Sequence, residues 1–162
     1  DGTTRLLTLD PVTIEFADLS LTLQTKVYFE EGSGSIQLER TILEMSDPNA
    51  EVELNEYMVA CYGTTEYPED MTGITLTCEG SGSETKSIVY EYRCREESLS
   101  GATAVSAVIP AIETKVSMTA SSEAEGYIRE GYAFSPMFTL GYKKKIRDKE
   151  RFATWLNLEK AN

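Results

Sequence analysis

The stretch from residue 71 to residue 97 contains two runs of alternating apolar and polar residues, separated by a turn rich in glycine and serine. The apolar residues occupy every second position from Ile74 to Cys78 in the first run, and from Ile88 to Cys94 in the second. Alternation of period two is typical of strands, and a Gly-Ser-Gly segment between two such runs indicates a β-hairpin. We therefore predict two paired strands here and a core built from β-sheet.

Short alternating runs of the same kind recur along the chain, with Gly, Pro, Ser and Asp at the turns between them. They cover residues 3–9, 12–16, 19–29, 36–42, 57–62, 104–109, 112–120, 127–128, 132–134 and 137–142. About nine or ten short strands with such turns are typical of an antiparallel β-sandwich or, alternatively, of a barrel. We predict an all-β fold in which residues 1–162 form a single β-sandwich domain.

The C-terminal segment has a different pattern. It spaces Phe152, Trp155 and Leu156 as i, i+3 and i+4, which is the spacing of one face of a helix. Asp148 precedes them and is a residue type favoured at helix N-caps. We therefore predict a C-terminal helix, with a final strand that places Ala153 and Trp155 on one face as the alternative.

The charge of the chain is unevenly distributed. The net charge is −12, but residues 143–162 hold seven basic and three acidic residues, against eight basic and twenty-four acidic residues before them. An acidic body repels nucleic acid and anionic membranes, so neither is an expected partner, and no apolar run is long enough to span a membrane. The basic C-terminal segment is either a solvated face or a contact for an acidic protein surface. The candidate contact residues are Lys143, Lys144, Lys145 and Arg147.

The chain contains no histidine. This excludes Ser-His-Asp and Cys-His catalysis and histidine-bound metals. A pair of carboxylates, as glycosidases use, is compatible with the composition, but such pairs are expected by chance among 27 acidic residues. We predict a non-enzymatic protein with no catalytic residue, no cofactor and no metal.

Two acidic clusters have the oxygen-rich side chains that calcium prefers. Their members are Asp47, Asn49, Glu51 and Glu53 in the first cluster, and Glu66, Glu69 and Asp70 in the second. Neither cluster matches an EF-hand loop, which needs a central glycine and a final glutamate. We therefore interpret both as solvated loop charge, and the sequence leaves open whether Asp47, Glu51, Glu66 or Asp70 binds a cation.

The three cysteines are Cys61, Cys78 and Cys94. Each shares the parity of its apolar neighbours, so burial as three core thiols is the simplest interpretation. An odd number permits at most one disulfide within the chain. A bridge from Cys61 to Cys78 or Cys94 is the alternative, because Cys78 and Cys94 do not face each other in the predicted hairpin.

These observations favour a structural or interaction module. The acidic body and basic end suggest a subunit that assembles with copies of itself, as in a pilus, filament or tail tube, at an extracellular or surface location. The alternative is a secreted or surface module that recognises protein or carbohydrate through loops bearing Tyr62 and Tyr67, since tyrosine is enriched at interfaces. A third possibility is a barrel that holds a small apolar ligand.

Overall fold

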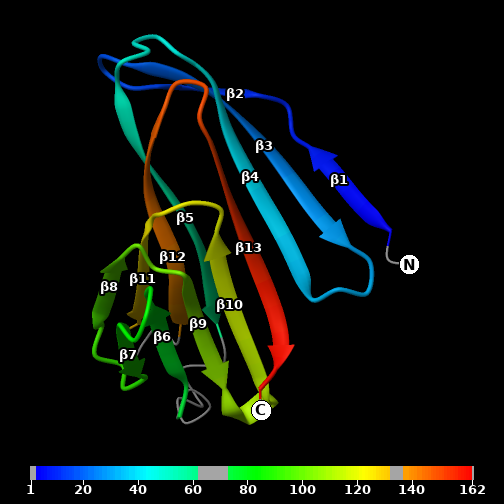
Figure 1. Ribbon diagram of the computed structural model, residues 1–162, viewed down its shortest axis with the longest axis vertical. Helices are drawn as coiled ribbons and strands as arrows, with labels where there is room; N and C mark the ends of the chain where they lie inside the picture. The colour runs from blue at the N-terminus through cyan, green and yellow to red at the C-terminus, as the bar shows by residue number, and fades with distance from the viewer. Residues whose placement is uncertain (1–2, 62–72, 132–136, 162) are drawn as a thin grey trace.

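The computed structural model describes residues 3–61, 73–131 and 137–161. Nearly all of the described chain is β-strand (Figure 1), which confirms the prediction of an all-β fold. The strands are β1 Thr4–Thr8, β2 Val12–Glu15, β3 Ser20–Glu30, β4 Ser35–Met45, β5 Glu51–Cys61, β6 Thr75–Glu79, β7 Thr85–Val89, β8 Glu96–Ser100, β9 Ala104–Ile109, β10 Thr114–Ala120, β11 Glu125–Glu130, β12 Met137–Arg147 and β13 Arg151–Lys160. One 3-10 turn, η2 Pro110–Ile112, joins β9 to β10.

The strands form two antiparallel sheets. The larger sheet has the order β1-β3-β4-β13-β10-β9-β6-β7, with β2 also paired to β3, and the smaller sheet has the order β5-β12-β11-β8. In Figure 1 the smaller sheet lies behind the larger one. The fold is therefore a sandwich rather than a closed barrel, and the described residues contain no helix of the length and apolarity that a membrane crossing requires.

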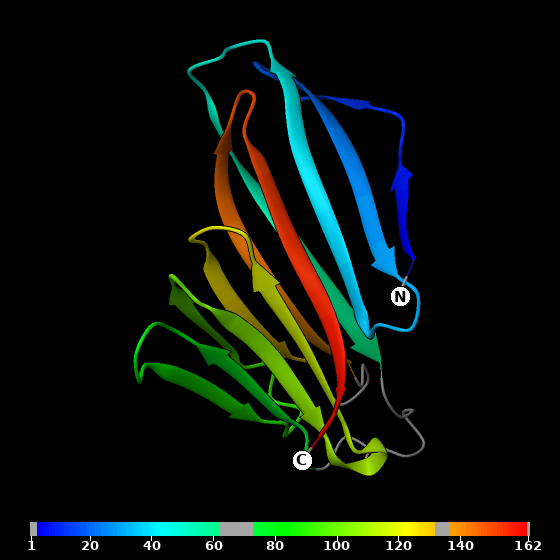
Figure 2. The ribbon, with the colours of Figure 1, turned by 45° about the vertical axis from the view of Figure 1, so that its right-hand side comes forward.

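The core lies between the two sheets. Leu76 and Val105 on the larger sheet and Phe138 and Leu140 on the smaller one are 0% exposed. Because successive side chains of a strand point to opposite faces, each of these residues is flanked by side chains on the outer face. Figure 2 shows that β1, β2 and β3 continue the larger sheet to one side of the smaller one.

The predicted hairpin is present, but its second strand is shorter than the alternation suggests. β6 and β7 pair from Thr75↔Val89 to Glu79↔Thr85. Beyond Val89 the alternation does not reflect a strand, since Tyr92 and Cys94 have φ values of 59° and 55°. The chain turns here around a buried carboxylate, which is described below.

The predicted C-terminal helix is wrong. Residues 151–160 form β13, which lies between β4 and β10 and pairs with both. The helical spacing of Phe152 and Leu156 arises because both belong to the inward face of a strand, while Ala153 and Trp155 share the outward face, as in the alternative prediction. Pairing on both edges outweighs a weak local helical pattern.

Two strands depart from the sequence patterns. β5 starts at Glu51, before the predicted strand at residue 57, and β8 covers Glu96–Ser100, where no separate strand is predicted. β8 is short and places only Leu99 in the core, opposite Gly126 of β11. Its serine-rich sequence therefore reflects an edge strand with one solvent-facing side.

Candidate functional site

A row of small polar side chains crosses the outer face of the larger sheet. Its members are directly opposite one another on six consecutive strands, which we call the polar row: Ser87, Thr77, Ser106, Ser117, Asn157 and Ser35. The alternation of each strand explains why they point outward. Thr77, for example, lies between Leu76 and Cys78, which are both 0% exposed in the core.

The hydrogen-bonding groups in the middle of the polar row have no partner in the protein. Ser106 and Ser117 are only 4% and 8% exposed. Among the described residues, none of the side-chain hydrogen bonds involves Ser106, Ser117, Thr77 or Asn157. Every fully buried side-chain oxygen or nitrogen in the described chain has a partner, so the two serine hydroxyls must reach the surface. They are available to a ligand from outside.

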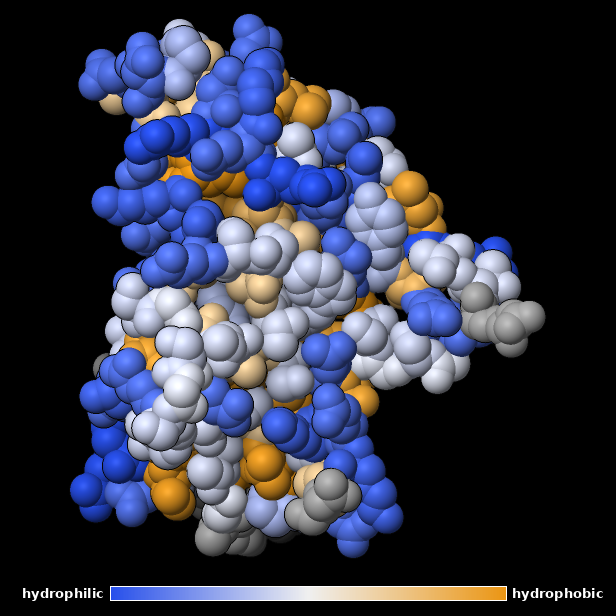
Figure 3. All heavy atoms as spheres, in the orientation of Figure 1, coloured by the Kyte–Doolittle hydropathy of each residue, from blue (hydrophilic) through white to orange (hydrophobic). Residues whose placement is uncertain are grey.

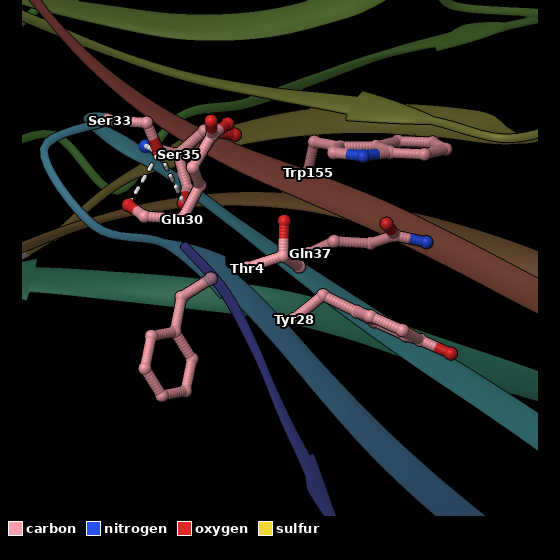
Figure 4. A pocket seen from close by; sticks show the side chains of 8 residues that line it. Thr4, Tyr28, Glu30, Ser33, Ser35, Gln37 and Trp155 are labelled. Carbon is pink, nitrogen blue, oxygen red and sulfur yellow. Dashed lines mark hydrogen bonds between the residues drawn. The ribbon is translucent and has the colours of Figure 1, made fainter. Parts of the chain in front are cut away.

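An aromatic hollow adjoins one end of the polar row. Trp155 lies opposite Gln37, and Gln37 lies opposite Tyr28. Figure 4 shows these three side chains extended side by side. The hollow has a volume of about 160 Å³ and is also lined by Thr4, Phe29, Glu30, Ser33 and Ser35. Ser35 belongs to both the hollow and the polar row, so the two features are continuous.

The middle of the face that carries these groups has intermediate hydropathy, and orange hydrophobic atoms show in separate places toward its upper end, right side and lower part (Figure 3). Figure 3 shows this face in the orientation of Figure 1. Pale atoms of residues with intermediate hydropathy cover its middle, and deep-blue atoms gather toward its upper end and lower edges. The face is therefore suited to an uncharged polar ligand rather than to a lipid or a nucleic acid.

One carboxylate of this face is well buried. Glu39 is 7% exposed and lies opposite Lys26 on β3 and Ala153 on β13. Its Oε2 atom is 3.5 Å from Nη1 of Arg151. Glu39 is two residues along β4 from Gln37, so their Cα atoms are about 7 Å apart. Lys26, opposite Glu39 on β3, places an ammonium group on the same face.

Two other buried carboxylates hold the fold together. Glu130 is 1% exposed and accepts hydrogen bonds from the backbone N–H groups of Glu91 (2.7 Å) and Arg93 (3.1 Å) and from Nε of Arg95 (2.7 Å). Burial alone would raise the pKa of Glu130, but these hydrogen bonds lower it. Its carboxylate therefore fixes the turn after β7.

The second buried carboxylate, Glu56, joins the two sheets. Its Oε2 atom lies 2.7 Å from Nε of Arg40, and Arg40 also contacts the hydroxyl of Thr25. All three side chains lie between the sheets. The pair stays hydrogen-bonded, as a buried ion pair requires.

Three of the four basic residues of the predicted partner contact, Lys143, Lys145 and Arg147, lie on the outer face of the smaller sheet, on β12. The fourth, Lys144, lies on the same side of this strand as the buried residues Tyr142 and Ile146. Lys143 lies 5.0 Å from the ring centroid of Tyr127 and 3.9 Å from Glu96. Lys144 donates to the carbonyl of Glu123, and Lys145 and Arg147 lie 3.6 Å and 3.2 Å from Glu51. Their charge is thus partly neutralised within the chain, and a role in partner contact stays a prediction.

The remaining predicted sites are dispersed. Tyr62 and Tyr67, with the second acidic cluster, lie outside the described residues. Within the described ranges no group of three or more acidic or cysteine residues is placed to hold a metal ion. Cys78 is buried and donates to the carbonyl of Gly126, Cys94 is half-buried and Cys61 is exposed. Burial, followed by the charge of Glu79, raises the pKa of Cys78 to about 11.

The polar row was not among the sequence predictions, although a signal for it exists. Four strands each place one polar residue between two apolar ones: Leu-Thr-Cys at residues 76–78, Val-Ser-Ala at 105–107, Val-Ser-Met at 116–118 and Leu-Asn-Leu at 156–158. This apolar-polar-apolar pattern predicts which residue of each strand points outward. It does not predict that these residues lie opposite one another, because that depends on the register in which the strands pair.

Comparisons with known proteins identify the fold. No family model matches the chain, and no curated protein is similar to it in sequence. Among solved structures, a galactose mutarotase-like protein from Lactobacillus casei has a TM-score of 0.57 and 10% identity over 98% of this chain and 72% of its own. The YeaD protein of Salmonella typhimurium, described as a mutarotase, has a TM-score of 0.61 and 8% identity over 96% of this chain and 60% of its own.

The Slr1438 protein of Synechocystis is similar at a TM-score of 0.61 and 12% identity, over 98% of this chain and 62% of its own. The chain thus spans 60% and 62% of the length of the Salmonella and Synechocystis structures, which is less than two thirds. At such low identity the likeness concerns the fold. A further protein of this group, from Escherichia coli, is described as an aldose 1-epimerase.

These similarities overturn the functional prediction made from the sequence. Three of the four structural neighbours described above are named as a mutarotase, a mutarotase-like protein or an aldose 1-epimerase, and none is named as a pilus, filament or tail-tube protein. The predictions of a structural module and of a non-enzymatic protein are therefore wrong. They failed because they relied on charge distribution and on the lack of histidine, neither of which reports the fold. The chain has a mutarotase-like β-sandwich fold.

Proposed function

We propose that the chain binds a saccharide on the outer face of the larger sheet and belongs to a carbohydrate-converting enzyme. The observation that carries this proposal is the combination of the polar row with the aromatic hollow. Sugars present hydroxyl groups in all directions around an apolar ring face. A surface that offers free hydroxyl and amide groups beside two aromatic side chains matches both properties.

The aromatic hollow is the proposed seat of one sugar ring. Trp155 and Tyr28 supply apolar surface, and Gln37 between them supplies one carbonyl acceptor and two N–H donors. Among the described residues, none of these three side chains is used in a hydrogen bond within the protein. A bound sugar ring can therefore form hydrogen bonds with these side chains without breaking a hydrogen bond inside the protein.

Proton transfer at this face would fall to Glu39 and Lys26. Opening a cyclic hemiacetal requires removal of the proton from the anomeric hydroxyl and delivery of a proton to the ring oxygen. Without histidine, a carboxylate and an ammonium group are the side chains that can share these tasks. Glu39 and Lys26 face each other across β4 and β3, next to the hollow. We assign Glu39 as the proton acceptor.

The binding proposal is tested by calorimetric titration of the protein with glucose, galactose and their disaccharides. We expect saturable binding of at least one of these sugars. The absence of binding to the whole panel would contradict the proposal. A positive result does not depend on catalysis, so the two parts of the proposal are separable.

The catalytic part is tested by polarimetry of freshly dissolved α-anomers of the sugar that binds. We expect the protein to accelerate equilibration of the anomers and Glu39→Gln to abolish most of that acceleration while binding persists. Glu44→Gln is the matched control, because Glu44 is an exposed glutamate of the same strand. Equal rates for wild type and Glu39→Gln would rule out Glu39 as the proton acceptor.

A further inference from the structure

We infer that the saccharide is a linear, uncharged oligosaccharide that lies across the strands along the polar row, with its terminal ring in the aromatic hollow. This inference rests on the proposed function and adds the ligand's length, charge and direction. It does not follow from the fold, because none of the neighbouring proteins described above is named for binding an oligosaccharide.

The length of the polar row sets the length of the ligand. Its six members stand on the consecutive strands β7, β6, β9, β10, β13 and β4. With neighbouring strands about 4.8 Å apart, the row is about 24 Å long. One sugar ring covers only a small part of this distance, whereas a chain of about four or five rings covers it all.

The serine hydroxyls in the middle of the row are available for contact with a ligand. Ser106 and Ser117 lie at its centre, more than nine-tenths buried, and no described residue accepts or donates a hydrogen bond to their hydroxyls. Since every fully buried side-chain oxygen or nitrogen of the described chain has a partner, both hydroxyls reach the surface and can bond to a ligand from outside. Ser117 lies two strands away from β4 and Ser106 lies three strands away. A sugar ring confined to the hollow therefore does not reach their hydroxyls.

The chemistry of the row indicates the charge of the ligand. Five hydroxyl side chains and one amide form it, and each can both donate and accept a hydrogen bond. None carries a charge, so the row offers no counter-ion for a uronic acid or a sulfated sugar. Neutral hydroxyl groups of a saccharide are the complementary partners.

The direction of the ligand follows from the position of the hollow. Ser35 belongs to the row and also lines the hollow, together with Trp155. The terminal sugar ring therefore binds near β4 and β13, close to Glu39. The remaining sugar rings extend over β10 and β9 toward β6. Thr77 on β6 contacts only a ligand that reaches the far part of the row.

Calorimetry with cello-, malto- and galacto-oligosaccharides of increasing length tests this inference. In the series that binds, we expect affinity to rise about tenfold or more from the monosaccharide to a chain of four or five rings and then to level off. An affinity that does not change with length would overturn the inference but leave the proposed function intact. The absence of binding by every saccharide would overturn both.

Thr77→Val provides the second test, because valine keeps the shape of threonine and removes the hydroxyl. We expect an affinity loss of about three- to tenfold for the longest oligosaccharide and no loss for the monosaccharide. Thr139→Val is the matched control, since Thr139 is a half-buried threonine on β12 of the smaller sheet. If Thr77→Val leaves the affinity for the longest oligosaccharide unchanged while Trp155→Ala lowers that affinity, the ligand does not follow the polar row.

Discussion

Ser106 on β9 and Ser117 on β10 are direct cross-strand neighbours whose side chains both point away from the core. Both are almost fully buried, yet neither hydroxyl is paired with another described residue. Both hydroxyls nevertheless reach the surface, since every fully buried side-chain oxygen or nitrogen of the described chain has a partner. The two serines form the centre of the proposed binding surface.

Trp155→Ala should weaken saccharide binding by about tenfold, because it removes the largest apolar surface in the hollow. Trp155→Phe should retain most of the affinity, because an aromatic ring remains. Isothermal titration calorimetry of the three proteins measures both effects, and circular dichroism checks that each variant is folded. Equal affinities for wild type and Trp155→Ala would place the sugar elsewhere.

Gly141→Ala should destabilise the smaller sheet by about 1–3 kcal/mol. A Cβ atom at this position would lie 2.6–2.7 Å from Cζ and Cε1 of Tyr127, whose ring is held by a 2.9 Å hydrogen bond from its hydroxyl to Asn55 Oδ1. Urea unfolding measures the free-energy change. In the double variant with Tyr127→Ala, the two costs should be clearly less than additive; strict additivity would show that the ring does not cause the effect.

Glu130→Gln should lower the free energy of unfolding by about 1–3 kcal/mol, because a buried carboxylate with several donors loses its charge. Glu84→Gln is the control, since Glu84 is exposed in the turn between β6 and β7, and a surface change of this kind should stay within about 0.5 kcal/mol. Chemical denaturation of both variants gives the comparison. A Glu130→Gln variant as stable as wild type would show that the turn after β7 does not depend on this charge.

The buried carboxylate of Glu130 should also make the stability of the folded protein sensitive to acid. The pKa of Glu130 is lowered in the folded protein from its ordinary value of 4.5, so the folded state binds this proton less readily than the unfolded state. The stabilisation is present above pH 4.5 and is lost as the pH falls through the lowered value. Thermal unfolding between pH 6 and pH 3 should therefore show a smaller loss of stability in Glu130→Gln than in wild type. If the unfolding temperatures of wild type and Glu130→Gln fall by the same amount between pH 6 and pH 3, Glu130 is not the source of the acid sensitivity.

Cys78 should resist alkylation in the folded protein. Its side chain is 0% exposed and its pKa is raised to about 11, chiefly by burial, so little thiolate forms at neutral pH. Cys61 is exposed and should react first with iodoacetamide. Mass spectrometry of labelled peptides gives the order of modification, and labelling of Cys78 as fast as Cys61 without unfolding would contradict the packing of β6.

The sequence supports the sheet structure well where one face of a strand is buried. The alternation from Ile74 to Cys78 identifies β6, and the runs at residues 104–109 and 112–120 contain the whole of β9 and β10. The alternation fails at Tyr92 and Cys94, because tertiary hydrogen bonds to Glu130 impose a turn on residues that locally suit a strand. It also fails at β13, where burial of Phe152 and Leu156 imitates helical spacing.

The candidate site could not be predicted in the same way. Thr77, Ser106, Ser117 and Asn157 come from distant parts of the chain, and each is an ordinary polar position of an alternating strand. Their alignment depends on the pairing of β6 with β9, β9 with β10 and β10 with β13. The sequence determines which face each residue occupies, whereas the register of the strands determines which residues meet.

The most direct test of the binding surface is to map the bound saccharide by NMR, with isotope-labelled protein and the sugar that gives saturable binding. We predict that the largest amide shift changes fall on β13, β10 and β9, near Trp155, Ser117 and Ser106, with little change on β12 and β11. Shift changes concentrated on the outer face of the smaller sheet, around Lys143 and Tyr127, would contradict the account.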